Sequence, residues 1–238
     1  MNNLWNHGEE TSTLTPSRRR FFQLAGASTL AVTATAACTS TSQAPAGAPP
    51  SLFHTVSGQG RNVLFLHGWA CDSHDWSWQL AAMENQFRCF AVDLRGHGRS
   101  EVTPSGTYQP DDFVADIEAF MLKHGGRQKF ILVGHSMSGQ IAARVASKRS
   151  DLVEGVVSVD GALGWEGDSV ELFRKTSETM QKEDPASTAN AMFQLVYAPT
   201  TLPSLKVWHA RRCIGTPAHV VRESFPPLFF GSGQGGGR

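Results

Sequence analysis

The chain has 238 residues, and its 21 Lys and Arg balance its 21 Asp and Glu, so the net charge at neutral pH is zero. This balance gives no sign of a basic surface, and we expect no nucleic-acid partner. Hydrophobic residues make up 40% of the chain, enough to fill the core of one medium-sized domain. The composition therefore excludes a disordered or fibrous protein.

The first 38 residues differ in character from the rest. Three arginines, Arg18, Arg19 and Arg20, precede an apolar, Ala-rich run that ends near Cys38. A basic segment followed by such a run is typical of an export signal, and this run is too short and too rich in Thr to span a membrane permanently. The order Ser17-Arg18-Arg19-Arg20-Phe21 resembles the twin-arginine signal of bacteria. We therefore expect the twin-arginine export machinery to carry the folded protein into the periplasm or out of the cell.

Two ways of processing this signal remain open. Cleavage after Ala34-Thr35-Ala36 would release the remainder of the chain. Alternatively, Ala36-Ala37-Cys38 would act as a lipoprotein box, and Cys38 would carry a lipid anchor that holds the protein at the membrane. In either case residues 39–51, which are rich in Ser, Thr, Pro and Ala, predict a flexible tether.

The cysteines indicate no cross-linked or metal-binding fold. Cys71, Cys89 and Cys213 follow the signal, and no C-x-x-C pair occurs. Cys89 lies inside an apolar run, where a cysteine behaves as a small buried hydrophobic residue. We expect neither a disulfide framework nor a metal site.

Strand-like and helical segments alternate over residues 52–163. A short strand and turn are expected at 52–59, and four apolar runs without polar alternation follow at 62–68, 87–93, 129–136 and 153–160. Such runs are typical of parallel strands that are buried on both faces. Helical stretches lie between them, at 76–86, 111–124 and 139–148. The alternation predicts an α/β fold with a mostly parallel, doubly wound sheet.

After residue 163 the pattern becomes helical. Residues 164–223 contain no convincing strand, which predicts a helical cap on the α/β core. Its aromatic residues would either line a pocket or pack between helices; they are Trp165, Phe173, Phe193 and Tyr197. Residues 224–238 begin with an apolar segment, predicted to be a core strand at 226–230, and end in a glycine-rich tail.

One short motif carries the chemistry. Ser136 ends the apolar run 129–136, and the stretch Gly134-His135-Ser136-Met137-Ser138-Gly139 leads into a helix. The usual G-x-S-x-G pattern places a nucleophilic serine on a sharp strand-to-helix turn, where bulky neighbours would clash. Ser138 stands where that pattern has its second glycine. Because serine is small and Gly139 follows, we expect the turn to tolerate it.

Two further motifs occur at the ends of earlier strands. His67-Gly68-Trp69 follows the run 62–68, and Asp93-Leu94-Arg95-Gly96-His97-Gly98 follows the run 87–93. Together with the serine motif, these segments resemble the α/β-hydrolase fold superfamily, and in particular the N-terminal half of a cap-bearing, carboxylesterase-like serine hydrolase. The resemblance covers residues 52–163, about half of the chain.

The resemblance implies a role for particular residues. Ser136 would be the nucleophile, and the backbone N–H groups of Trp69 and Met137 would form the oxyanion hole. Serine at this position argues against haloalkane dehalogenase and epoxide hydrolase relatives, which carry Asp there. In the family, residues equivalent to His67 and His97 order loops, and the side chain of His135 would point away from the nucleophile.

The acid and histidine of a catalytic triad are expected after Ser136 in this fold. The resemblance places them beyond the predicted strand at 226–230, so we expect the last core strand and helix, and with them the usual triad acid and histidine, to be missing from this chain. His209 and His219 lie in the predicted cap and are expected to be surface or packing residues. Asp160 remains a weak alternative for the acid. Loss of the histidine in such a triad costs on the order of 10⁶ in kcat, so this chain alone should be nearly inert.

The sequence therefore predicts an exported serine hydrolase that acts on a carboxylic ester of a small molecule, without a cofactor. A C–C hydrolase, an aminopeptidase or a perhydrolase would use the same motifs. The competing class is a catalytically inactive truncated hydrolase or pseudoenzyme fragment that binds a small apolar ligand at most.

Overall fold

The computed structural model describes residues 47–164 and 168–230. The predicted signal at 1–38, most of the predicted tether, Trp165 and the glycine-rich tail at 231–238 lie outside these residues. Within the described ranges, strands and helices both occur up to residue 159, and only helices occur after it.

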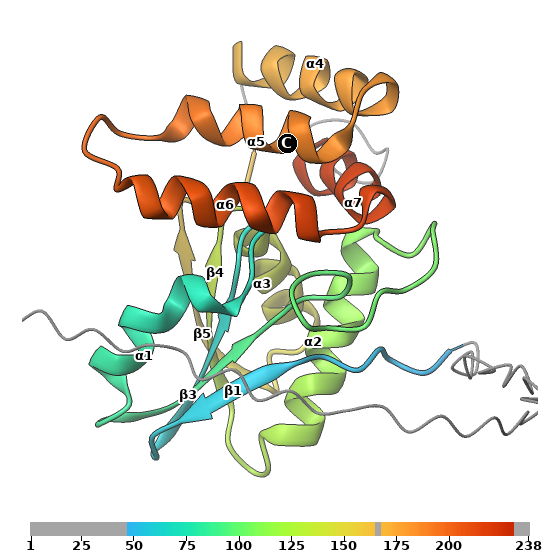
Figure 1. Cartoon of the computed structure of the whole chain (residues 1–238). Helices are drawn as coiled ribbons and strands as arrows, with labels where there is room; N and C mark the ends of the chain where they lie inside the picture. Colours follow the sequence, from blue (N-terminus) through green and yellow to red (C-terminus); the bar gives the residue numbers. More distant parts are fainter. Residues whose placement is uncertain (1–46, 165–167, 231–238) are drawn as a thin grey trace, which may run out of the picture. The chain divides into compact units, whose positions relative to one another are not determined.

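Five strands form one sheet (Figure 1). They are β1 (His54–Ser57), β2 (Arg61–Leu66), β3 (Phe87–Val92), β4 (Phe130–His135) and β5 (Val153–Val159). The spatial order is β1-β3-β2-β4-β5, in which β1 runs antiparallel to β3 and all other neighbours are parallel. The predicted mostly parallel sheet is confirmed. The chain reverses its direction of winding between β2 and β4, and in open α/β sheets the ligand crevice lies at such a point, beyond the carboxyl ends of the strands.

Helices cover both faces of this sheet, as predicted. On one face lie the 3₁₀ helix η1 (Ser73–Trp76) and α1 (Ser77–Met83), and on the other lie α2 (Pro110–His124) and α3 (Met137–Lys148). The side chains of β2 alternate between the two resulting cores: Val63 and Phe65 join the cluster around Trp76, whereas Leu64 and Leu66 join the larger cluster. Burial on both faces explains why β2 is a continuous apolar run.

The expectation that all four apolar runs are buried on both faces is wrong for β5. Val156 and Val157 point to opposite faces of the sheet, and they are 38% and 48% exposed. The reason is position: β5 is hydrogen-bonded to β4 on one side only and is an edge strand of the described sheet. A Val-rich run has the same sequence pattern whether or not another element covers it.

Four helices follow the sheet and lie above the carboxyl ends of its strands (Figure 1). They are α4 (Asp168–Lys182), α5 (Pro185–Val196), α6 (Pro203–Gly215) and α7 (Ala218–Phe230). The start of α5 shows why these sequences form helices here: Asp184 accepts a hydrogen bond from the Ser187 N–H at 2.9 Å, and Pro185 occupies the first helical position. We use the name cap for α4–α7.

The predicted core strand at 226–230 is wrong, because these residues form the end of α7. Val220, Val221, Ser224 and Phe225 are buried, and their positions i, i+1, i+4 and i+5 lie on one face of a helix. The Ser224 hydroxyl also donates to the Val220 carbonyl oxygen at 2.6 Å. The helix begins at Ala218, before the apolar segment, and continues through it to Phe230. Residues 224–230 therefore belong to the cap.

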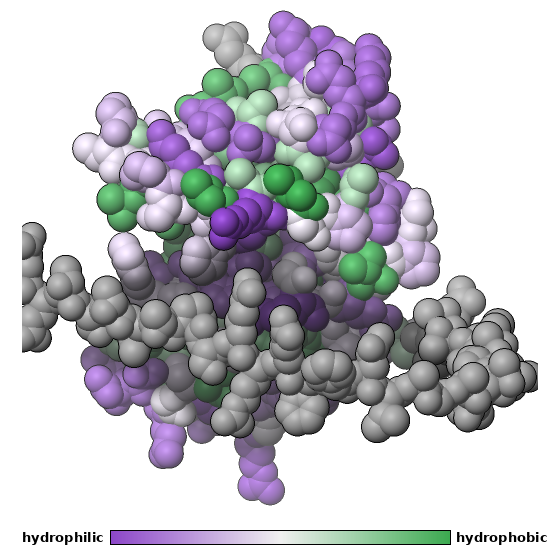
Figure 2. Space-filling model, viewed as in Figure 1, coloured by the Kyte–Doolittle hydropathy of each residue, from purple (hydrophilic) through white to green (hydrophobic). Residues whose placement is uncertain are grey.

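The surface of the cap is mixed in polarity. Figure 2 shows apolar residues interspersed with hydrophilic ones over the cap helices. Several large apolar side chains of α5 and α6 are exposed, among them Leu195, Val196, Val207 and Ile214. None of the helices in the described ranges has the length and apolar character needed to cross a membrane.

Candidate active site

Ser136 occupies a strained position between β4 and α3. Its backbone has φ 52° and ψ −119°, a combination that residues with a side chain rarely adopt. The residue lies at the carboxyl end of β4, beside the point where the winding of the sheet reverses, and it is half-buried. This is the geometry of a sharp strand-to-helix turn that presents one side chain at the top of the sheet.

Small neighbours make this turn sterically feasible. A Cβ atom on Gly134 would collide with the carbonyl group of Ser138, and a Cβ on Gly139 would lie 2.7 Å from the Cα of Gly161. Ser138 is fully buried, and its hydroxyl donates to the His67 carbonyl oxygen at 2.5 Å. The serine in place of the second glycine is therefore tolerated, as expected, and it also ties the turn to the loop after β2. The G-x-S-x-G pattern does not predict the hydrogen bond between Ser138 and His67.

Backbone hydrogen bonds hold the strained conformation. The Ser136 N–H donates to the Val159 carbonyl oxygen at 3.0 Å, and the Ser136 carbonyl oxygen accepts from Gly139 and Ala162 at 2.9 Å each. Val159 is the last residue of β5 and Ala162 lies in the loop after that strand. The neighbouring strand and its loop therefore fix the backbone of the turn by hydrogen bonds. The strain is thus imposed by the surrounding structure.

The two predicted oxyanion donors lie on either side of Ser136. Met137 is the first residue of α3, and the N–H groups of a first helical turn have no acceptor within the helix. Trp69 belongs to the loop after β2, which reaches the turn: a Cβ placed on Gly68 would lie 3.5 Å from the Ser136 Cβ. Met137 therefore adjoins Ser136 in sequence, and the loop that carries Trp69 lies against the turn.

The Trp69 side chain also anchors the cap. It is buried, its Nε1–H donates to the Val221 carbonyl oxygen of α7 at 3.3 Å, and its ring centroid lies 4.8 Å from that of Phe225. Phe193 of α5 stacks on it at 6.4 Å. Phe173 likewise contacts Phe225, so Phe173 and Phe193 serve in helix packing, one of the two roles expected for them.

His67 and His97 order the loops after β2 and β3, as the resemblance implied. His67 Nε2 accepts from the Leu94 N–H at 2.9 Å, which leaves its Nδ1–H to donate to the Gly68 carbonyl oxygen at 2.7 Å. His97 Nδ1–H donates to the Arg95 carbonyl oxygen at 2.8 Å and closes its turn. Burial lowers the pKa of His67, and burial together with the neighbouring His67 lowers the pKa of His97 to about 3. Both are neutral rings, and neither is a base for Ser136.

Ion pairs join the same loops to the rest of the core. The buried Asp93 carboxylate accepts from the N–H of Ser73 at 2.8 Å and from the N–H of Arg99 at 2.9 Å, and these bonds hold its pKa below the usual value despite burial. Arg95 forms two hydrogen bonds of 2.6 Å with the buried Asp116 of α2. The loops that frame the serine are therefore cross-linked by charge-assisted bonds.

The remaining histidines near or beyond the serine are also engaged elsewhere. His135 packs edge-on against Trp76 at 6.5 Å, on the α1 face of the sheet, so its side chain points away from Ser136, as expected. His209 is hydrogen-bonded through Nδ1 to the Tyr197 hydroxyl at 2.9 Å, and His219 Nε2 lies 3.2 Å from the Thr103 carbonyl oxygen. Among residues 47–164 and 168–230, no histidine is hydrogen-bonded to Ser136.

Asp160, the weak alternative for the acid, follows β5 directly. The last registered pair of β4 and β5 is His135 with Val159, which places Asp160 beside Ser136 at the end of the sheet. Its backbone also has a positive φ, of 47°, and its side chain is exposed. It is near Ser136 but is not hydrogen-bonded to a described histidine.

No metal site is found among the described residues. Their His, Cys, Asp and Glu side chains do not gather in groups of three or more that could hold one. Cys71, Cys89 and Cys213 are free and buried.

Comparison with known families agrees with this geometry. Residues 61–203 match the family described as the alpha/beta hydrolase fold. The match includes the serine turn and both loop motifs, and the chain belongs to this family.

Individual relatives have several activities. The chain is 37% identical over 106 residues to a serine hydrolase-like protein of Danio rerio and 37% identical over 98 residues to a non-heme haloperoxidase of Rhodococcus erythropolis. It is 32% identical over 109 residues to a pimeloyl-[acyl-carrier protein] methyl ester esterase of Vibrio cholerae. These matches cover 42%, 41% and 46% of this chain, but only 31%, 35% and 40% of the relatives, so the chain spans roughly a third of their length.

Solved structures share the fold over a larger part of the chain. An esterase from Exiguobacterium antarcticum superposes with a TM-score of 0.67 at 20% identity, covering 76% of this chain and 70% of the esterase. At this identity the likeness shows the fold alone.

Gly134, two residues before Ser136, provides a test of the strained turn. Gly134→Ala should destabilise the protein by about 1–3 kcal/mol or displace the turn, because the new Cβ collides with the Ser138 backbone. Gly155→Ala in β5 is the matched control, since a Cβ there meets nothing within 4 Å. Urea unfolding of both variants measures the effect. Equal stabilities would contradict the close approach at Gly134.

The buried His97 predicts a pH-dependent stability. Its pKa is about 3 in the folded protein and near 6.5 when unfolded, so below pH 6.5 the unfolded chain binds a proton that the folded protein does not. Stability is therefore full above pH 6.5 and falls with acidification. Between pH 7.5 and 5.5 this histidine should cost about 1.4 kcal/mol.

His97→Gln should remove the about 1.4 kcal/mol that His97 contributes to the stability difference between pH 7.5 and 5.5. The substitution should also lower the stability at pH 7.5. Urea unfolding at the two pH values measures it. An unchanged difference between pH 7.5 and 5.5 in the variant would show that His97 is not a buried neutral ring.

Proposed function

We propose that the protein is a serine hydrolase that acts by nucleophilic acyl transfer through Ser136, on a carboxylic ester of a small molecule. One observation carries the proposal: Ser136 is held in a strained backbone conformation, half-buried, between a central strand and the start of a helix. Strain of this kind persists only where the surrounding structure imposes it, and it is concentrated at functional sites.

The chemistry depends on this position. The Ser136 hydroxyl attacks the acyl carbon of the ester, its proton passes to a general base, and the carbonyl oxygen becomes an oxyanion. The N–H groups of Met137 and Trp69 donate to that oxyanion, and loss of one such donor typically costs about 10²–10³ in kcat. The names of the serine hydrolase-like relative and of the methyl ester esterase support both the serine nucleophile and the ester substrate.

The general base is the part of this mechanism that the described residues do not supply. Each described histidine near the serine is hydrogen-bonded or packed elsewhere, and a serine without its histidine loses on the order of 10⁶ in kcat. We therefore expect ester turnover by this chain alone to be close to background, while Ser136 remains open to a strongly electrophilic reagent.

A fluorophosphonate probe tests the nucleophile directly. Prolonged incubation should modify Ser136, identified by mass spectrometry of the digested chain, and Ser136→Ala should remove the label. Ser177→Ala in α4 is the control and should label like the original chain. Modification of a different serine, or none at millimolar probe over a day, would contradict the proposal and favour a non-catalytic binding protein.

We also propose that the protein is exported by the twin-arginine machinery and works in the periplasm or outside the cell, either free or anchored through a lipid on Cys38. The order of residues 17–38 supports this. Replacing Arg18 and Arg19 with Lys should leave the precursor in the cytoplasm, whereas Arg20→Lys alone should not. Fractionation followed by immunoblotting distinguishes the two, and unchanged export of the double variant would refute the proposal.

A further inference from the structure

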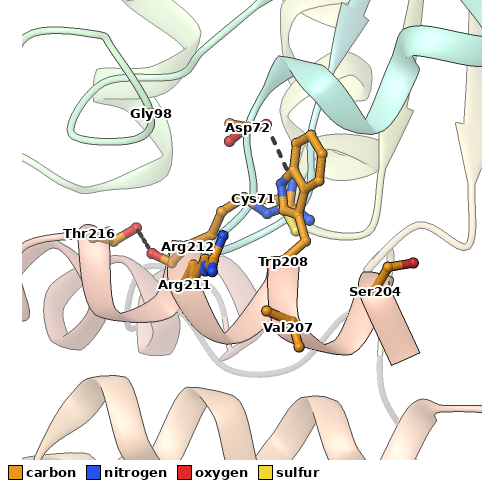
Figure 3. A pocket seen from close by; sticks show the side chains of 10 residues that line it. Cys71, Asp72, Gly98, Ser204, Val207, Trp208, Arg211, Arg212 and Thr216 are labelled. Atoms are coloured by element: carbon orange, nitrogen blue, oxygen red, sulfur yellow. Dashed lines mark hydrogen bonds and ion pairs between the residues drawn. The ribbon is translucent and has the colours of Figure 1, made fainter. Parts of the chain in front are cut away.

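A cavity lies between α6 and the loop after β2, apart from the Ser136 turn. Its volume is about 700 Å³, within the range of small-molecule sites in proteins. Its lining includes Cys71 and Asp72 from the loop, and Val207, Trp208, Arg211 and Arg212 from α6 (Figure 3). Ser136, Trp69 and Met137 are not among its lining residues.

One wall of the cavity is a buried ion cluster. Arg212 is only 9% exposed, and its Nη1 donates to Asp75 at 2.6 Å and to Asp72 at 3.3 Å. Its Nε is buried without a hydrogen-bond partner, and its Nη2 makes no hydrogen bond with any described residue. A guanidinium that is nine-tenths buried and keeps unused donors is costly unless an acceptor is supplied.

One arginine of the lining, Arg211, has no ion pair within the described residues and can attract an anion. Asp72 contributes one negative charge and already shares Arg212, whereas Arg211 is exposed and forms no ion pair within residues 47–164 and 168–230. Burial raises the pKa of the Cys71 thiol well above its usual value, so that this group is neutral. Asp75 does not line the cavity, but its carboxylate pairs with Arg212, so two arginines stand against two carboxylates and Arg211 is the cation left to attract an anion.

The other wall is apolar and aromatic. Trp208 is 44% exposed, and Val207 lies beside it on α6 with half of its surface exposed. Figure 3 shows the Trp208 indole next to Asp72 and Cys71, with the Arg212–Asp72 contact behind it. Arg212 lies over the Trp208 ring, with its Cζ 5.8 Å from the ring centroid, and His74 packs edge-on against it at 5.5 Å. The exposed remainder of the indole, next to Arg211, suits a flat ring that carries a carboxylate, because the ring packs on the indole and the carboxylate accepts from Arg.

We propose that this cavity is a binding site for a small aromatic carboxylate, whose ring packs on Trp208 and whose carboxylate pairs with Arg211 and with Nη2 of Arg212. The site does not depend on the proposed chemistry of Ser136. It does adjoin the catalytic loop, since Cys71 follows Trp69 by two residues.

Calorimetric titration of the full chain tests the site with two probes of equal shape. 2-Naphthoate should bind with a Kd on the order of 0.1–1 mM, and 2-naphthylmethanol, which replaces the carboxylate by a neutral CH₂OH, about tenfold more weakly. Arg211→Gln should weaken naphthoate about tenfold and leave the alcohol unchanged. Trp208→Leu should weaken both probes by about tenfold.

Two matched variants serve as controls. Trp78→Leu removes another exposed tryptophan, on α1, and Arg127→Gln removes an exposed arginine before β4; both should bind the probes like the original chain. Thermal unfolding verifies that each variant is folded. Equal binding of the two probes, or naphthoate binding that is unaffected by Arg211→Gln and Trp208→Leu, would overturn the proposal, as would the absence of measurable heat with naphthoate at 10 mM.

Discussion

The whole candidate site depends on the close approach of β4 to α3 around Ser136. A backbone held at φ 52° and ψ −119° costs about 1–3 kcal/mol, and it persists because Val159 and Ala162 of the neighbouring strand and loop bond to its amide and carbonyl groups. The contact at Gly134 leaves no room for a side chain. The Ser136 side chain is thus held at the end of the sheet at a cost in local backbone energy.

The loops around this turn behave as one polar framework. Ser138 bonds to the loop after β2, His67 joins that loop to Leu94 after β3, and Asp93 bonds back to Ser73. Each of these groups is buried, so an unpaired member would cost about 1–3 kcal/mol. The framework explains why neutral histidines are required there: a protonated His67 would lose the acceptor that the Leu94 N–H needs.

Much of this could be predicted from the sequence. Central parallel strands are continuous apolar runs, and the glycines and serine of the turn are dictated by local sterics. The exposure of β5 could not be predicted, because burial of a valine run depends on what lies beside it. The apolar segment at the end of α7 resembles a strand in sequence, because the buried helical face that it continues begins earlier, at Val220. The Arg212–Asp72 contact joins positions 140 residues apart, and no spacing rule reveals it.

The proposed chemistry requires that the turn present Ser136 to an acyl carbon with two backbone donors behind it. The most direct measurement is a crystal structure of the chain after reaction with a fluorophosphonate. We expect a phosphorus–oxygen bond to Ser136 and a phosphoryl oxygen within about 3 Å of the N–H groups of both Met137 and Trp69. An adduct on Ser136 whose phosphoryl oxygen points into solvent, away from both amides, would contradict this mechanism.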